Sequence, residues 1–361
     1  MNYTDNERAI IWLDAIIALS REQKLKLINK TKSPAAIFND VSVVEDCVGT
    51  VISEAQYGYI RAAKELNVDD DIIKQLNKEN ITAITCMSDG YPSRYLQTSE
   101  PPLILYCKGN IDLLSSKHTF AIVGSRKTLP QILSIAEEFS SELAKNDVTI
   151  VTGLAEGVDT AVINGALQTG NIISIIPGGF RHIYPEFNRN LFEKVTQKGL
   201  VITERTLATV PKPYLFPERN RLIAGLADGL LVCSAGQKSG TSYTADYANE
   251  YGKNVFAFPY SLGVPSGEGC NALIKEYAML CDSVDDIFLS LGVVKKKPEK
   301  TVQLTEQEQK VFACIKQGEI HIDLLLQKTG MKIYEITPVL TMLEIKKYII
   351  KNPGNTYSAI K

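Results

Sequence analysis

The chain has 361 residues, of which 45% are hydrophobic and 22% are charged, a balance that predicts two or three folded domains and excludes wholesale disorder. Its 39 Lys and Arg residues against 41 Asp and Glu residues give a formal net charge of −2. That charge excludes a generally basic protein that coats nucleic acid, so any anion site must be a local cluster.

The cysteines and histidines of the chain exclude further classes of protein. Seven cysteines without a C-x-x-C pair argue against a disulfide framework or a zinc ribbon and favour a reducing compartment. Three histidines are too few for metal catalysis, and we expect neither a metal nor a cofactor. The sequence shows no secretory signal and no run of about 20 apolar residues, so we expect a cytoplasmic protein without a membrane partner.

Residues 1–88 predict a small all-helical domain. Apolar side chains recur at helical spacing in four segments, residues 7–19, 22–29, 54–66 and 70–79. A strand pattern first occurs at residues 81–87.

Residues 89–292 predict an α/β domain. Short apolar strands alternate with amphipathic helices, and small residues follow most of the strands. The strands are 119–123, 148–151, 172–176, 200–203, 229–233 and 254–258, and the helices are 130–145, 160–168 and 244–251. This alternation indicates a doubly wound parallel sheet, whose ligands bind at the carboxyl ends of the strands.

The last part of the chain predicts a linker and a third domain. Residues 293–302 are rich in lysine and form the linker. Residues 303–361 contain helices at 306–317, 322–328 and 334–347, followed by two short strands around the Pro353-Gly354 turn. Three helices closed by a hairpin are the outline of a winged helix. Its Lys346, Lys347 and Lys351 could meet phosphates, but the absence of arginine favours a protein-contact role.

Three small-residue loops follow strands of the predicted sheet. Gly124-Ser125-Arg126 precedes a helix, where free backbone N–H groups and the helix dipole favour a phosphate. Ser239-Gly240-Thr241-Ser242, with Lys238 beside it, and Pro177-Gly178-Gly179 are the other two loops. We expect all three to line one crevice. Arg126 stands where the dinucleotide fingerprint needs a glycine, which argues against a dehydrogenase.

The segment from Pro213 to Arg221 interleaves aromatic side chains with arginines. Bases stack on aromatic faces and phosphates pair with arginine, so this composition suits single-stranded nucleic acid. An equally good interpretation places Tyr214 and Phe216 in the core and pairs the arginines with Glu204 and Glu218. Asp159 is expected to cap the helix that follows it rather than to act as an acid or base. No Ser/His/Asp or Cys/His constellation is present.

Several of these stretches together closely resemble the DNA-processing protein DprA (Smf) family. The matching segments are residues 89–92, 101–106, 122–126, 153–161, 183–185, 216–226, 239–242 and 269–274. The string from Phe216 to Leu226 is the most specific of them. The resemblance runs from about residue 89 to residue 292.

The resemblance implies an extended Rossmann-like sheet domain between an N-terminal SAM-like helical domain and a C-terminal winged helix. It also implies a non-catalytic homodimer, joined through the sheet domain, that binds and protects single-stranded DNA. Such a protein loads the RecA recombinase onto incoming DNA in natural transformation. The expected DNA-binding residues are Gly124, Ser125, Arg126, Gly178, Gly179, Arg189, Lys212, Tyr214, Phe216, Arg219, Asn220, Arg221, Lys238, Ser239, Gly240, Thr241 and Ser242. Glu186 stands where family members often carry lysine, so Arg189 is expected to supply that charge.

Two other functions remain open at this point. The first is a phosphoribohydrolase resembling lysine-decarboxylase-like proteins, which needs a glutamate where this chain has Thr244. The second is a small-nucleotide sensor with the winged helix as its output domain.

Overall fold

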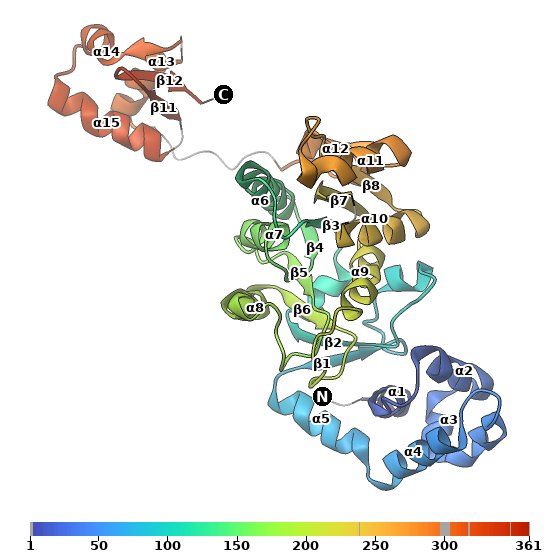
Figure 1. The fold of residues 1–361 in the computed structure, drawn as a ribbon. Coiled ribbons are helices and arrows are strands. Elements are labelled where there is room, and N and C mark those ends of the chain that lie inside the picture. The colour runs from blue at the N-terminus through green and yellow to red at the C-terminus, as the bar shows by residue number, and fades with distance from the viewer. Residues whose placement is uncertain (1–2, 238, 297–303, 317, 347, 361) are drawn as a thin grey trace. The chain divides into compact units, whose positions relative to one another are not determined.

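The computed structural model describes residues 3–237, 239–296, 304–316, 318–346 and 348–360. The chain forms two compact units, Met1–Lys295 and Lys296–Lys361 (Figure 1). No helix in the described ranges is both long and apolar enough to span a membrane.

The N-terminal region is helical, as the apolar spacing predicts. Its helices are α1 (Asp5–Ala15), α2 (Arg21–Thr31), α3 (Pro34–Asn39), α4 (Glu54–Glu65) and α5 (Val68–Lys78). Thr4, Ser20 and Ser53 begin α1, α2 and α4 with capping boxes, which satisfy backbone N–H groups that a helix start leaves unpaired. The sequence did not predict α3 or the 3₁₀ turn Val41–Cys47.

The helical region and the sheet belong to one compact unit. The core of α1 is continuous with the core of the sheet, and the Tyr106 hydroxyl donates to Asp14 Oδ2 over 2.9 Å. The sheet begins with β1 (Thr82–Thr85), so it includes residues upstream of position 89.

The nine-stranded sheet has the order β1-β2-β6-β5-β4-β3-β7-β8-β9. The remaining strands are β2 (Ile104–Gly109), β3 (His118–Gly124), β4 (Val148–Thr152), β5 (Ile172–Ile175), β6 (Leu200–Thr203), β7 (Gly229–Ser234), β8 (Asn254–Ala257) and β9 (Met279–Leu280). The neighbouring strands β6, β5, β4, β3, β7, β8 and β9 pair in parallel. Strands β2 and β1 extend the sheet at the β6 edge by antiparallel pairing. The doubly wound parallel sheet is thereby confirmed, with an antiparallel extension that the sequence did not predict.

Helices cover both faces of this sheet. The helices are α6 (Pro130–Lys145), α7 (Val158–Ala166), α8 (Arg189–Lys198), α9 (Leu215–Leu226), α10 (Gly240–Glu250), α11 (Glu268–Glu276) and α12 (Val284–Leu291). One core contains side chains of α6, α7, α8 and α12, and the opposite core contains those of α9, α10 and α11. After β3 the chain winds outward through β4, β5 and β6, and later returns to β7 on the other side of β3. This reversal is the topological switch point, where open α/β sheets bind ligands.

The second unit has winged-helix architecture. It contains α13 (Glu306–Ile315), α14 (Ile322–Thr329) and α15 (Ile333–Ile345) with a sheet of order β10-β12-β11. The strands are β10 (Ile320–His321), β11 (Ile349–Asn352) and β12 (Thr356–Ala359). Of the lysines expected to meet phosphates, Lys346 instead pairs with buried Glu308 at 2.7 Å. Lys347 lies outside the described residues, and Lys351 is exposed.

Candidate nucleic-acid interface

A cavity of about 380 Å³ lies at the switch point, and we call it the switch-point cavity. It is lined by the end of β3, the start of α7, one side of α9 and the start of α10. The lining residues are Val123, Gly124, Ser125, Arg126, Ala155, Asp159, Phe216, Arg219, Asn220, Ile223, Ser239, Gly240, Thr241 and Thr244. Nine of the residues expected to bind DNA therefore surround one cavity, although they come from three distant parts of the sequence.

The loop after β3 is tied to β7. The Ser125 amide and hydroxyl both donate to the Ser234 carbonyl, over 2.9 and 3.2 Å. Helix α6 starts only at Pro130, after Leu129 as its N-cap. The expectation that Gly124-Ser125-Arg126 presents free amides at a helix N-terminus is therefore wrong for the Ser125 amide, and Arg126 lies before the helix.

Arg126 is exposed and, within the part of the chain that the structure describes, has no ion-pair partner. Its guanidinium carbon lies 5.3 Å from the Phe216 ring centroid and 5.8 Å from that of Tyr184. These two rings contact each other edge to face, with centroids 5.6 Å apart. Sequence reasoning did not single out Tyr184, although its segment belongs to the matching motifs. A guanidinium in this position keeps its charge and its N–H groups available to a ligand.

Arg219 forms the floor of the cavity. The residue is 7% exposed, one terminal nitrogen donates to the Ile175 carbonyl, and its Nε is buried without a partner. A side chain on Gly153 would collide with both Arg219 and the Asp159 carboxylate. Only glycine therefore leaves room for the two charges to approach each other beneath the cavity. The Nε is thus a buried donor without a hydrogen bond, and the Arg219 charge lies directly beneath the cavity.

Asp159 stabilises this floor rather than capping a helix. Its carboxylate accepts from the Ala155 amide and from the Thr152 hydroxyl, both over 3.2 Å. Helix α7 has Gly157 as its N-cap without a side-chain cap, so the capping prediction is wrong. Burial raises the pKa of the Asp159 carboxyl, and the Arg219 guanidinium opposes that rise. Burial likewise lowers the pKa of Arg219, which Asp159 opposes.

The start of α10 forms the opposite wall. Ser239 is the N-cap, and its hydroxyl accepts from the Thr241 amide over 3.2 Å. The side-chain amide of Asn220 donates from Nδ2 to the Gly240 carbonyl over 3.2 Å, which fastens α9 to α10. The positive end of the α10 dipole thus faces the same cavity as Arg126 and Arg219. Ser242 lies on the first turn of α10 but does not line the cavity, and Lys238 lies outside the described residues.

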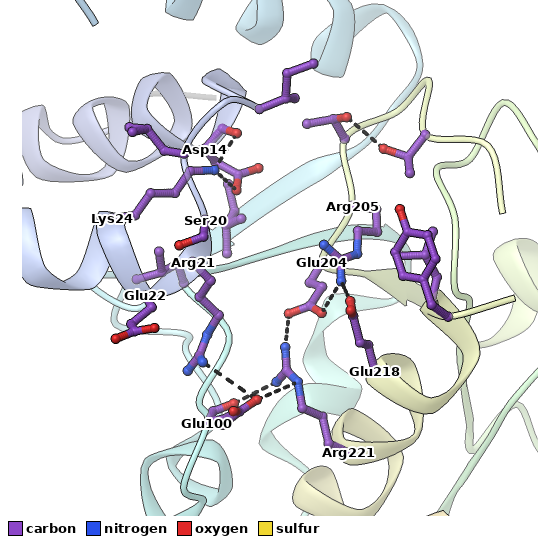
Figure 2. Close-up of a pocket in the computed structure, with 18 of the residues that line it drawn as sticks. Asp14, Ser20, Arg21, Glu22, Lys24, Glu100, Glu204, Arg205, Glu218 and Arg221 are labelled. Atoms are coloured by element: carbon purple, nitrogen blue, oxygen red, sulfur yellow. Dashed lines mark hydrogen bonds and ion pairs between the residues drawn. The ribbon is translucent and has the colours of Figure 1, made fainter. Parts of the chain in front are cut away.

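The other side of α9 borders a second cavity of about 1150 Å³, here called the ion-pair cavity (Figure 2). Its arginines are Arg21, Arg205 and Arg221, and its acids include Glu100, Glu204 and Glu218. Glu218 contacts Arg205, and Arg205 lies 3.3 Å from Glu204. Glu204 contacts Arg221, which lies 3.6 Å from Glu100, and Glu100 lies 3.8 Å from Arg21. Each arginine of this cavity is thus neutralised.

Three expected DNA-binding residues lie at the ion-pair cavity instead of the switch-point cavity: Arg221, Lys212 and Tyr214. Arg221 is 5% exposed and held by Glu204, so in this structure its guanidinium is not available to a DNA phosphate. The interpretation that Glu204 and Glu218 pair with the arginines of the segment from Pro213 to Arg221 is correct for Arg221, which Glu204 holds, but Glu218 pairs with Arg205 and neither acid pairs with Arg219. Lys212 and Tyr214 are exposed.

The glycines after β5 do not line the switch-point cavity either. The Gly179 amide donates to the Thr209 carbonyl over 2.8 Å, and a Cβ on Gly178 would lie 2.7 Å from Pro211 Cγ. The expectation that three loops line one crevice is therefore wrong for this loop, because residues 206–211 pack over it. Arg189 is also elsewhere, paired with Glu186 at 2.7 Å.

The chain matches two family profiles. Residues 82–292 match the family described as DNA recombination-mediator protein A, and residues 295–355 match the DprA winged helix domain. The chain is 34% identical to the DNA processing protein DprA of Bacillus subtilis over 236 residues, which cover 65% of this chain and 77% of that protein. It is 32% identical to the DprA of Streptococcus pneumoniae over 274 residues, which cover 74% and 93%.

Two solved structures are also similar. The X-ray structure of DprA from Streptococcus pneumoniae has a TM-score of 0.66 at 30% identity and covers 80% of this chain and 98% of that one. A structure of the Helicobacter pylori DNA processing protein A, described with a single-stranded DNA binding mode, has a TM-score of 0.54 at 30% identity. It covers 58% of this chain and 95% of that one.

Proposed function

The chain belongs to the family of DNA recombination-mediator protein A, and on that premise we propose that it binds single-stranded DNA in the switch-point cavity. The relative from Helicobacter pylori, whose structure describes a single-stranded DNA binding mode, supports this ligand. Catalysis is not part of the proposed role.

The observation that best supports this function concerns the groups that face the switch-point cavity. They are one aromatic ring and two arginines that form no ion pair closer than 4 Å among the described residues. Arg126 has no ion-pair partner among the described residues, and Arg219 retains an unpaired Nε beside Asp159. Phe216 lies within reach of Arg126. Arginine recognises phosphate oxygens and aromatic rings stack on bases, so this combination suits a strand whose bases are unpaired.

The central experiment is a salt series of oligonucleotide binding, with single strands and duplexes of equal length compared by fluorescence anisotropy. We expect the single strand to bind more tightly, because paired bases cannot reach Phe216. The affinity should fall linearly with the logarithm of salt, with a slope of about −0.7 per phosphate contacted. Equal affinity for single strands and duplexes would refute the proposed ligand.

The family further supports a mediator role, in which the protein protects incoming single strands and loads the RecA recombinase onto them during natural transformation. A homodimer joined through the sheet domain would let two cavities hold one strand, and the linked sites would raise affinity for long strands. Light scattering at micromolar concentration tests the dimer, and RecA filament assembly with and without the protein tests loading. A monomer that still binds long strands tightly would contradict the dimer.

The rival enzyme would need a carboxylate at position 244, where the structure has a buried threonine in the wall of the cavity. Asp159 lies in the same cavity, but its oxygens accept from Ala155 and Thr152 beside Arg219. We expect no release of free base from nucleoside monophosphates. Release of free base would show that the protein is a hydrolase rather than a DNA-binding protein. Tighter binding of mononucleotides than of oligonucleotides would instead favour a nucleotide sensor.

A further inference from the structure

We propose that Tyr184 is a base-stacking residue of the DNA site, an inference that rests on the proposed function and names a contact none of the matching motifs assigns. Tyr184 lies between β5 and α8, outside the residues that line the switch-point cavity, but its ring contacts Phe216, which lines it. The Tyr184 ring therefore extends the aromatic surface from the cavity wall outward.

The two rings and Arg126 leave aromatic surface open to solvent, most of it on Tyr184. The planes of Tyr184 and Phe216 meet at 81°, and an edge-to-face pair covers only one of the four ring faces. The Arg126 guanidinium covers at most one face of each ring. Tyr184 is the more exposed residue at 47%, whereas Phe216 is half-buried, so a base has better access to Tyr184.

The segment that carries Tyr184 is held in place on both sides of it. Ile183 is buried in the core. The side-chain amide of Asn188 donates from Nδ2 to the Leu154 and Ala155 carbonyls over 2.9 and 3.2 Å. A ring fixed before the ligand arrives loses little conformational entropy when a base stacks on it. Phe187 lies on the same anchored segment, so the contact with Phe216 is what distinguishes Tyr184 from an aromatic side chain that is merely exposed.

The charges near Tyr184 also suit a nucleotide. Arg126 contacts the ring and can pair with a phosphate while the base lies on tyrosine. Glu186, two residues further on, forms an ion pair with Arg189 at 2.7 Å, so its negative charge is offset. A base on Tyr184 would then adjoin the phosphate at Arg126, and the strand would continue beyond the cavity over this ring.

The test uses the full chain and two ligands, oligo-dT and an abasic strand of equal length, at low salt, where the phosphate contacts keep both measurable. We expect Tyr184→Ala to weaken oligo-dT binding roughly 5- to 150-fold, the range for one stacked base, and to leave the abasic strand unaffected. Tyr184→Phe keeps the ring and should keep the affinity, and it also serves as a folded variant that lacks only the hydroxyl.

Two control variants make the outcome specific. Phe187→Ala removes a ring that is more exposed, at 66%, but for which the described residues provide no ring contact, and it should bind like the wild type. Arg126→Ala should weaken the binding of both strands, because it removes a phosphate contact.

An equal loss of affinity for both strands in Tyr184→Ala would overturn the stacking role and reduce Tyr184 to a support for Arg126. Unchanged oligo-dT binding would also overturn it, whereas a wild-type protein that binds neither strand would refute the proposed function itself.

Discussion

The two sides of helix α9 carry arginines in opposite electrostatic states. On the side of the switch-point cavity, Arg219 keeps an unpaired Nε, and Arg126 across the cavity has no ion-pair partner among the described residues. On the side of the ion-pair cavity, Arg221 is held by Glu204 and Glu100. Residues two apart on a helix face different directions, so one short motif supplies both a ligand site and a structural ion pair. The pairing of an arginine, rather than its presence, separates the two roles.

The largest expected effect is on the neutralised side. Arg221→Ala should lower the free energy of unfolding by about 3–5 kcal/mol, because it leaves the Glu204 carboxylate buried without its main partner. Chemical denaturation measures this loss. Arg205→Ala is the matched control: its pair with Glu218 is partly exposed and Arg221 still holds Glu204, so the cost should be about 0–1 kcal/mol. If Arg221→Ala is as stable as wild type but binds DNA poorly, the two sides of α9 have been assigned the wrong way round.

The next largest expected effect is on the affinity for single-stranded DNA, at the switch-point cavity. Arg126→Ala should weaken single-strand binding by about 1–3 kcal/mol, the range for a charge-assisted hydrogen bond, without changing stability. The residue is exposed and its charge is not needed to neutralise an acid in the described structure. Titration of a labelled oligonucleotide measures the change, with Lys127→Ala, an exposed neighbour outside the cavity lining, as the control. Wild-type affinity in Arg126→Ala would remove this residue from the site.

The smallest expected effect comes from removing the winged helix. Residues 1–295 form a compact unit of their own, and both cavities lie within it. A chain that ends at residue 295 should therefore keep most of its single-strand affinity. Its salt slope should fall only slightly, because Lys346 is occupied by Glu308 and leaves Lys351 as the remaining described lysine of the expected set. A folded 1–295 chain that no longer binds would relocate the site to the tail.

The sequence was sufficient for the architecture because the sheet strands are continuous apolar runs and the helices are amphipathic. Helix α6 and strand β6 lie at the residues that the pattern predicts. Strand β9 has only two residues and no pattern to detect, and β2 joins the parallel strands through its pairing with β6, about 95 residues further along the chain. Such pairings over long sequence distances are not encoded in local periodicity.

Prediction of the site was limited by the same kind of distant contact. The motif around Phe216 indicated helix α9 but not which of its residues line the switch-point cavity, because Glu204 and Glu100, which pair with Arg221, lie on other segments. Glycine-rich loops gave a similar ambiguity. Gly124 borders the cavity, whereas Gly178 and Gly179 are glycines because another loop packs over them. Tyr184 could have been suspected from its matching segment, yet its contacts with Phe216 and Arg126, which connect it to the cavity, appear only in the structure.

The most direct test of the account is to map where a bound strand touches the protein. An oligonucleotide carrying photoreactive thymines is cross-linked to the full chain, and the modified residues are identified by mass spectrometry. We expect adducts around the switch-point cavity, at the end of β3, on Phe216 and its neighbours in α9, and at the start of α10. Adducts confined to the ion-pair cavity or to residues 304–360 would contradict the central claim that the switch-point side of α9 holds the DNA.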